Sequence, residues 1–310
     1  MKHLETKNGT PISRLGFGAM QFGRTADEQS AREMFETCIG AGINLFDTAF
    51  SYTGGASERI LGKLVAPMAD DILIATKAPN DRPSSSDNLR ASYEESRKRL
   101  GIDSIDMYYL HRFDSETPLE ETFGTLAEMQ SEGMIRHIGV SNFAAWQIMK
   151  AQAVCAKFDT QIDVCQPMYN LVKRQVEVEI LPACEDQGIS VCPFSPLGGG
   201  LLTGKYADGA AGRLKDDRTY AARYGQPWMH ETARGLSALS ASLAIPATTL
   251  AVAWVARHPA VTSTLISARN ASQLQPSLDA LDLELSDDLF AEVTRLSPNP
   301  ASATDRSEET

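Results

Sequence analysis

One structural unit recurs along this chain: a short apolar run typical of a buried strand, then a polar loop, then apolar residues at helical spacing. Eight such runs predict strands at Leu15–Gly18, Asn44–Phe46, Ile72–Thr76, Met107–Leu110, His137–Val140, Val164–Gln166, Ser190–Pro193 and Ser263–Ile266. Eight helical patterns alternate with them, at Ala26–Ala41, Ser57–Leu64, Ser84–Leu100, Leu119–Glu132, Ala144–Cys155, Val176–Asp186, Ala247–Arg257 and Ser272–Leu281. Helical crossovers force successive strands to be parallel, so the sequence predicts an α/β fold of the (β/α)8 TIM barrel class.

A doubly wound Rossmann sheet is the alternative architecture. It is disfavoured because no GxGxxG motif follows the first expected strand. The glycines of LGFGAMQFG open no immediate helix with an acidic residue about 20 positions on, as dinucleotide binding of that type requires. The barrel is therefore the preferred prediction.

Several segments lie outside the eight units. An N-terminal β-hairpin is expected over Lys2–Ser13, because Asn8-Gly9 favours a type I′ turn, and it would cap the bottom of the barrel. Two extra helices are expected at His230–Leu243 and Ser286–Leu296. With no boundary inside the barrel, residues 1–310 are predicted to form a single domain.

One long connection, from Phe194 to about Trp228, is expected to be irregular and is rich in glycine. Long irregular loops in compact domains are usually functional. The tail Ser297–Thr310, rich in Pro, Ser, Thr and Glu, is expected to be mobile.

Charge and composition narrow the possible partners. The formal net charge is -11 and the pI about 5.0, which argues against nucleic acid or an anionic membrane surface. The five cysteines show no CxxC or zinc-type spacing, so no metal is expected and a reducing cytoplasm fits best. The N-terminus has no apolar signal region, and no run of about 18 apolar residues occurs, so neither export nor a membrane span is indicated.

Polar side chains follow three successive expected strands. Asp47 ends the second strand, Tyr52 follows it by five residues, Lys77 ends the third and His111 follows the fourth. Taken singly, a lysine or histidine at such a place is more often solvated or structural. In a closed barrel, however, the carboxyl ends of the strands converge on one mouth, so we expect these four side chains to meet.

Such a cluster has a definite chemistry. A tyrosine phenol has a pKa of about 10, and a nearby ammonium favours the phenolate and lowers that pKa. A carboxylate beside the lysine keeps the lysine charged, and a histidine can orient a carbonyl oxygen. Because the cluster contains no nucleophile, a cofactor would deliver the attacking group, and hydride is the natural candidate.

These four residues, together with four further motifs, resemble the aldo-keto reductases. The motifs are GVSNF at Gly139–Phe143, QPMYNL at Gln166–Leu171, PFSPLGGGLLTGKY at Pro193–Tyr206 and SARNASQLQ at Ser267–Gln275. The resemblance runs from about Ser13 to Leu296 and is strongest to the bacterial branch that is similar to potassium-channel β subunits. It implies a barrel that binds NADPH in an extended pose across its mouth and reduces an aldehyde or ketone to an alcohol.

The resemblance also implies a role for individual residues. Tyr52 would donate the proton, Lys77 and Asp47 would tune it, and His111 would orient the carbonyl. The implied contacts at the nicotinamide end of the cofactor are Gly18, Ala19, Met20 and Asp47. The nicotinamide carboxamide would bond to Ser141, Asn142 and Gln166, and the nicotinamide ring would stack on Phe194. The pyrophosphate would be surrounded by Ser195, Leu197, Gly199 and Lys205. The family usually has tyrosine or tryptophan where this chain has Phe194.

The implied preference for NADPH over NADH rests on the segment after the eighth strand. Arg269 and Asn270 would take the adenosine 2′-phosphate, with Gln273 also contacting the cofactor. The chain departs from the family at Gln275-Pro276-Ser277, where an acidic residue and an asparagine usually hold adenine.

Other interpretations stay open. Ser141 and Asn142 are also good N-caps for a helix beginning near Ala144. The alternative functions are an NAD(P)-dependent sugar or polyol dehydrogenase and a cofactor-binding regulatory subunit of the channel-β type, whereas a Schiff-base lyase is disfavoured because Asp47 would keep Lys77 charged. The expected walls of the substrate pocket are aromatic: Phe22, Phe50, Phe113, Tyr169 and Trp228.

Overall fold

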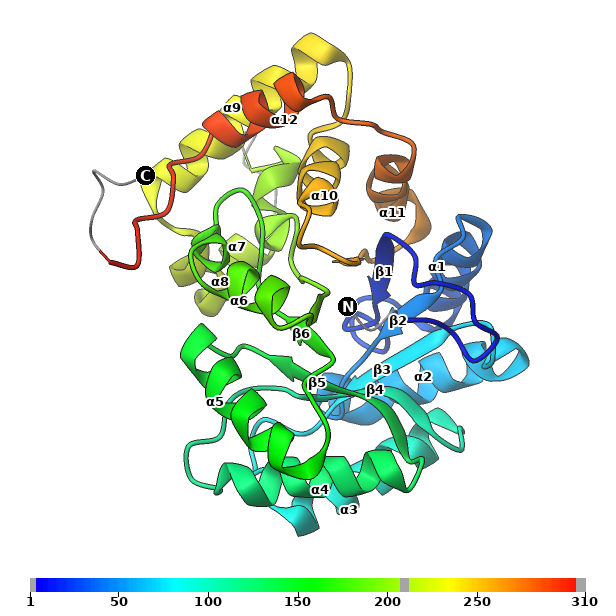
Figure 1. Ribbon diagram of the computed structural model, residues 1–310. Coiled ribbons are helices and arrows are strands. Elements are labelled where there is room, and N and C mark those ends of the chain that lie inside the picture. Colours follow the sequence, from blue (N-terminus) through cyan, green and yellow to red (C-terminus); the bar gives the residue numbers. More distant parts are fainter. Residues whose placement is uncertain (1–3, 207–211, 305–310) are drawn as a thin grey trace.

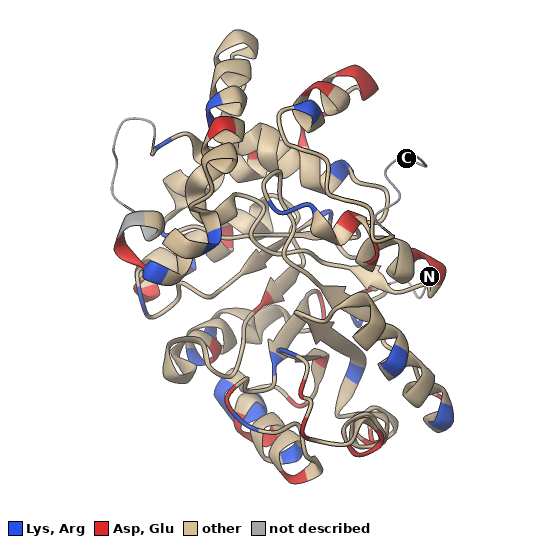
Figure 2. Ribbon diagram, turned by 90° about the vertical axis from the view of Figure 1, so that its left-hand side faces the viewer, with Lys and Arg blue, Asp and Glu red and all other residues tan. Residues whose placement is uncertain are grey.

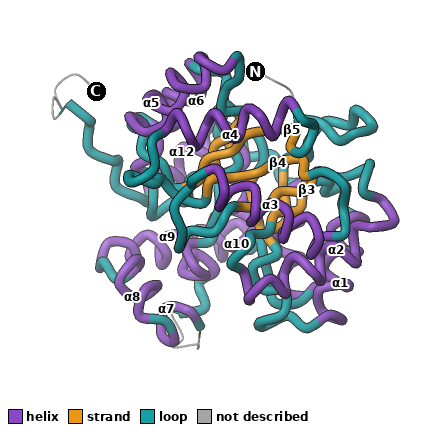
Figure 3. The backbone as a smooth tube through the Cα atoms, turned by 90° about the horizontal axis from the view of Figure 1, so that it is seen from below, coloured by secondary structure: helices purple, strands orange, loops and turns teal. Residues whose placement is uncertain are grey.

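Eight parallel strands occupy the centre of the molecule and helices surround them (Figures 1 and 3). The computed structural model describes residues 4–206 and 212–304, without the side chains of Arg213 and Lys215. The strands are β1 Leu15–Gly18, β2 Leu45–Asp47, β3 Leu73–Lys77, β4 Ile105–Leu110, β5 Ile135–Ser141, β6 Val164–Gln166, β7 Ser190–Val191 and β8 Thr264–Ile266. All eight predicted strands are therefore present, with ends that differ by a few residues.

The strands follow one another in the order β7-β6-β5-β4-β3-β2-β1-β8. The two ends of this order are joined by a parallel bridge between Phe194 and Leu265 and by backbone hydrogen bonds from Thr262 to Val191 (2.8 Å) and from Leu265 to Pro193 (2.9 Å). The sheet thus curls round on itself, consistent with a (β/α)8 fold. Because every ladder is parallel, the carboxyl ends of the strands lie at one end of the sheet.

Helices cover the outside of the sheet (Figure 3). Those that connect successive strands are α1 Glu28–Gly40, α2 Ala56–Val65, α3 Ser86–Leu100, α4 Leu119–Ser131, α5 Ala145–Cys155, α6 Ile180–Asp186 and, before β8, α10 Ala247–Arg257. The others are α7 Arg213–Asp216, α8 Arg218–Tyr224, α9 Pro227–Leu243, α11 Ala271–Leu278 and α12 Asp287–Arg295. The two extra helices predicted from the sequence correspond to α9 and α12.

The strands bury two separate sets of side chains because successive residues of a strand point to opposite faces. Leu45 of β2 and Leu73 and Ala75 of β3 belong to the cluster inside the sheet. Their outward neighbours, such as Phe46, pack under the helices. Asp47 continues the inward alternation of β2, and Lys77 continues that of β3. The strand periodicity therefore directs both polar side chains into the interior at the carboxyl end of the sheet.

The N-terminal turn differs in detail from the predicted hairpin. Glu5 and Pro11 form a single antiparallel bridge, and Gly9 has a φ of 79°, but Asn8 does not have a positive φ. The predicted type I′ turn, which needs positive φ at both positions, is therefore wrong. Leu4 and Ile12 pack against the cluster inside the sheet, so this turn closes its amino end; Lys2 lies outside the described residues.

The connection from Phe194 to Trp228 is more regular than predicted. A 3-10 turn occupies Gly198–Thr203, and α7 and α8 follow it, although residues 207–211 lie outside the described part. Helix α9 begins at Pro227 rather than at His230, because proline is well accommodated in the first helical turn. The expectation of a mobile tail at Ser297–Thr310 is untested, and its residues 305–310 lie outside the described range.

The length and apolarity of the helices bear on whether any could span a bilayer. Within residues 4–206 and 212–304, none is by itself both long and apolar enough to cross a membrane. Helices α9 and α10 reach the required length and apolarity only when taken together, and they meet at a bend of 105°.

Candidate active site

Asp47 and Lys77 form a buried ion pair at the carboxyl ends of β2 and β3. Lys77 Nζ lies 2.5 Å from Asp47 Oδ1 and also donates to the backbone oxygen of Thr48 at 2.8 Å. Burial is the largest single influence and lowers the pKa of the Lys77 ammonium, but Asp47 and Tyr52 together outweigh burial and the pKa is raised. Lys77 is therefore charged at neutral pH and unsuited to act as an amine nucleophile.

Tyr52 lies next to this pair, on the turn between β2 and α2. Lys77 Nζ is 5.1 Å from the centre of the Tyr52 ring. Burial raises the pKa of the Tyr52 phenol; the Lys77 charge opposes this rise without reversing it. The expected lowering of the Tyr52 pKa is therefore wrong for this structure, because burial has the larger effect. Tyr52 carries its proton at neutral pH, as a proton donor must.

His111 follows β4 and faces Tyr52 edge to face, with 5.8 Å between the ring centres and an angle of 78° between the rings. Burial, with Lys77 and Arg112 adding positive charge nearby, lowers the pKa of His111 to about 3. The imidazole is thus neutral at physiological pH. Its Nδ1 atom is buried and has no hydrogen-bond partner within the described residues.

The ends of β5 and β6 complete this side of the site. Gln166 donates from Nε2 to Asp47 Oδ2 at 2.8 Å, and Ser141 donates from Oγ to the Gln166 backbone oxygen at 2.9 Å. Asn142 has a φ of 58° and donates to the His111 backbone oxygen at 3.0 Å. The N-cap of α5 is Ala144, so the alternative interpretation of Ser141 and Asn142 as caps is wrong.

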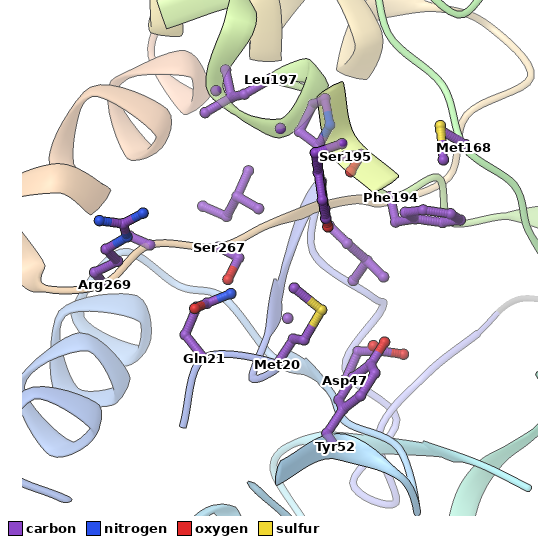
Figure 4. Close-up of a pocket in the computed structure, with 18 of the residues that line it drawn as sticks. Met20, Gln21, Asp47, Tyr52, Met168, Phe194, Ser195, Leu197, Ser267 and Arg269 are labelled. Atoms are coloured by element: carbon purple, nitrogen blue, oxygen red, sulfur yellow. The ribbon is translucent and has the colours of Figure 1, made fainter. Parts of the chain in front are cut away.

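A cavity of about 640 Å³ extends from these residues across the mouth of the sheet. In Figure 4, Tyr52 and Asp47 lie together on one side of it and Arg269 lies on the opposite side, with Gln21 and Ser267 between them. The predicted site residues that line it are Gly18, Met20, Asp47, Tyr52, His111, Ser141, Asn142, Gln166, Phe194, Ser195, Leu197, Gly199, Lys205, Arg269 and Gln273. Most of the residues predicted from the sequence are thus brought to one cavity.

Three predicted residues stand apart from the lining. Ala19 is fully buried, and Lys77 reaches the site only through Asp47 and Tyr52. Asn270 is the N-cap of α11, where its Oδ1 accepts from the Gln273 backbone nitrogen at 3.0 Å. Its side chain is thus engaged within its own helix.

The predicted aromatic walls do not line this cavity. Phe22 and Tyr169 are completely buried in the outer core and do not line this cavity. Phe50 is buried beneath the Tyr52 turn, whereas Phe113 and Trp228 are partly buried against the core; all three lie outside the lining. Aromatic residues near a strand end pack inward or outward according to backbone direction, which composition does not reveal.

Several lining residues have no sequence signal strong enough to find them. Gln21 and Met168 each sit one or two positions from a predicted residue, and Tyr220 and Arg223 come from α8. Lys205, Arg223 and Arg269 supply positive charge, whereas Asp47 is the sole carboxylate among the described residues that line the cavity. Elsewhere both signs of charge are spread over the helices around the sheet (Figure 2).

Comparison with known proteins agrees with this geometry. A model described as the Aldo/keto reductase family matches residues 14–298, which include all of β1 to α12. The chain belongs to the aldo/keto reductase family. The family resemblance predicted from the sequence motifs is therefore confirmed, and the protein is an oxidoreductase of this family.

Similar aldo/keto reductase sequences carry different names. A probable voltage-gated potassium channel subunit beta of Arabidopsis thaliana is 33% identical over 294 residues, covering 89% of this chain and 90% of the relative. The uncharacterized oxidoreductase YrpG of Bacillus subtilis is 32% identical over 317 residues and 96% of both chains. Aflatoxin B1 aldehyde reductase member 2 of Rattus norvegicus is 38% identical over 207 residues, covering 64% of this chain and 56% of the relative.

Proposed function

We propose that this protein is an NADPH-dependent reductase that converts an aldehyde or ketone to an alcohol. The observation that carries the proposal is the arrangement of Tyr52, Lys77, Asp47 and His111 at one end of a cavity whose other end holds Arg269. A protonated phenol, a fixed ammonium and a neutral imidazole suit the polarisation of a carbonyl group.

The cavity has the properties that a phosphorylated dinucleotide requires. Away from Asp47 its charged lining residues are the cations Lys205, Arg223 and Arg269, which complement phosphate groups. Two buried nitrogens of lining residues, Gln21 Nε2 and His111 Nδ1, have no hydrogen-bond partner within the described residues. Unsatisfied buried polar groups are costly, so a ligand that bonds to them would be favoured. These groups support NADPH as the ligand, and Arg269 would bind its 2′-phosphate.

Each protein group then has a separate task. The bound nicotinamide would supply hydride to the carbonyl carbon. His111 and Tyr52 would hold the carbonyl oxygen by hydrogen bonds, and the Tyr52 phenol would give its proton to that oxygen. The Lys77 ammonium would stabilise the resulting tyrosinate, and Asp47 would keep Lys77 charged and aimed at Tyr52.

Replacing Tyr52 with phenylalanine tests this assignment. We expect Tyr52→Phe to lower turnover of an aldehyde, followed at 340 nm, by about 10²- to 10⁴-fold, because the proton donor is lost. NADPH affinity, measured by quenching of protein fluorescence, is expected to stay within about twofold, since the ring remains. Turnover retained by the variant would refute Tyr52 as the acid, and wild-type protein that fails to bind NADPH would refute the cofactor assignment.

A second candidate function is supported by the names of two relatives. The Arabidopsis protein and one from Oryza sativa, both 33% identical to this chain, are named probable voltage-gated potassium channel subunits beta. A regulatory subunit would bind NADPH yet turn over carbonyls very slowly. Wild-type protein that binds NADPH but reduces no member of an aldehyde and ketone panel would favour this candidate over the reductase.

A further inference from the structure

Arg99, near the end of α3, lies against the turn that carries Tyr52. Its side chain is 15% exposed, and Nη1 donates to the Phe50 backbone oxygen at 3.0 Å. The guanidinium carbon is 4.4 Å from the centre of the Phe50 ring. A Cβ atom placed on Gly55 would lie 2.5 Å from the same carbon, so the backbone there comes very close to Arg99. Arg99 therefore contacts the turn on both sides of Tyr52.

Glu58 joins Arg99 to the strand that bears Lys77. The Glu58 side chain is completely buried, and its Oε2 lies 3.0 Å from Arg99 Nη1. Its Oε1 accepts from Thr76 Oγ1 at 2.7 Å, and Thr76 immediately precedes Lys77. One buried carboxylate thus links the end of β3 to the residue that holds the Tyr52 turn.

The turn itself needs such support. Three consecutive residues after Tyr52 have left-handed backbones, with φ of 52° at Thr53, 60° at Gly54 and 81° at Gly55. A non-glycine residue in this region is strained, and such a conformation persists only where the surroundings fix it. Arg99 supplies a hydrogen bond, a flat stacking surface and a charge pair at this point. A guanidinium provides all three together, whereas an ammonium does not.

We infer that Arg99 and Glu58 are positioning residues that hold the Tyr52 phenol at the correct place relative to Lys77. Neither residue lines the cavity, so they would act through the Phe50–Gly55 backbone and through Thr76. The inference rests on the proposed reductase function. Small displacements of a reacting group cost large factors in rate, so loss of this link should lower kcat more than it lowers cofactor affinity.

A merely structural role is the competing explanation, because removal of Arg99 leaves the buried Glu58 carboxylate without its cation. Two variants separate the explanations. Arg99→Met removes the guanidinium, and the double variant Arg99→Met with Glu58→Gln also removes the stranded charge while keeping an acceptor for Thr76. Arg90→Met is the matched control, since Arg90 lies on the same helix and pairs with the exposed Glu128 and Glu132.

The experiment compares these variants by kcat with an aldehyde at saturating NADPH, by NADPH affinity, by melting temperature and by hydrogen exchange of residues 49–56. We expect Arg99→Met and the double variant to lose about tenfold to a hundredfold in kcat. Their NADPH affinity should stay within about twofold of wild type, with faster exchange confined to residues 49–56. The double variant should melt higher than Arg99→Met without regaining kcat, and Arg90→Met should match wild type in kcat and exchange.

The inference is overturned if the double variant regains both stability and kcat, or if Arg99→Met reduces kcat no more than Arg90→Met does. Wild-type protein without turnover would instead refute the proposed function. Hydrogen exchange would then decide the inference alone: faster exchange restricted to residues 49–56 supports it, and unchanged exchange refutes it. If Arg99→Met fails to fold, the double variant and Arg99→Lys are compared with Arg90→Met in its place. Arg99→Lys keeps the positive charge but loses the planar guanidinium.

Discussion

The Asp47 carboxylate and the Lys77 ammonium are both almost fully buried, and the attraction between them offsets the desolvation penalty of each. An isolated charge in this environment would carry a large desolvation penalty, whereas the close pair also gains hydrogen bonds to Gln166 and to the Thr48 backbone. The contacts of Lys77 with Asp47 and Tyr52 keep the ammonium charged despite its burial, whereas burial keeps the Tyr52 phenol protonated. At the level of single residues, a protonated phenol thus lies beside a charged ammonium before any ligand binds, as the proposed proton donation requires.

His111 gives a pH-dependent prediction. Its pKa of about 3 in the folded state lies below the value of about 6.5 for an unfolded chain, so between these values the unfolded state binds more protons. Stability from this group is therefore fully present above about pH 6.5 and is lost as the pH falls toward 3. We expect His111→Gln to reduce the loss of unfolding free energy between about pH 7.5 and pH 5 by about 2 kcal/mol, measured by urea titration.

Equal pH dependence in wild type and His111→Gln would show that His111 does not have a depressed pKa. A direct check is the ring resonance of His111 by NMR, which should not move between about pH 5 and pH 8.

At the scale of elements, the sequence predicted the strands well and the connections less well. Alternation and apolar runs record which residues face the core, so β1 and β6 were predicted with their observed bounds. The connection before α9 carries less information, because its short helices α7 and α8 form against the glycine-rich turn rather than from strong periodicity. The strand ends likewise predicted the meeting of Asp47 and Lys77, but burial, a property of the whole fold, decided the pKa of Tyr52.

The packing of α2 on α3 gives an element-scale prediction. A Cβ atom on Gly62 of α2 would lie 2.3 Å from the Leu100 backbone oxygen at the end of α3. Gly62→Ala would therefore push the two helices apart, and we expect it to cost about 2 kcal/mol or more in unfolding free energy. Because Arg99 precedes Leu100, the same change should speed hydrogen exchange in the Tyr52 turn.

Gly40→Ala is the matched control for Gly62→Ala, since a Cβ at Gly40 meets no atom within 4 Å. Helix propensity makes that change neutral or slightly stabilising. Chemical denaturation of both variants measures the difference. If Gly62→Ala were as stable as Gly40→Ala, close contact between α2 and α3 would not be needed to place Arg99.

At the scale of the whole molecule, a net charge of -11 surrounds a cavity that carries local positive charge. The net charge was readable from composition, and Lys205 and Arg269 were found by their motifs. The cavity walls could not be predicted from the sequence in the same way. The five aromatic residues predicted as walls lie outside the lining, because the direction of a side chain depends on the backbone of its loop. Arg223 joins the cavity only because α8 folds back over the turn at Gly198–Thr203, with Tyr220 beside Gly199.

The distribution of charge along the cavity predicts how the cofactor is chosen. Arg269 lies on the side opposite Tyr52, where the 2′-phosphate that distinguishes NADPH from NADH would lie. A hydrogen bond between charged groups contributes about 1.5–3 kcal/mol, or about tenfold to a hundredfold in affinity. We therefore expect Arg269→Met to weaken NADPH binding by about tenfold or more and NADH binding by less than about twofold, measured by fluorescence titration.

Arg295→Met is the control, because Arg295 is exposed on α12 and the change alters the net charge by the same amount. It should leave both affinities unchanged at moderate salt, since exposed charges act weakly over such distances. Equal weakening of NADPH and NADH by Arg269→Met would place the guanidinium on a phosphate that both cofactors share. Selective weakening of NADPH binding would instead mean that Arg269 attracts the additional phosphate of NADPH. This attraction would then overcome the repulsion between the net negative protein and the more highly charged cofactor.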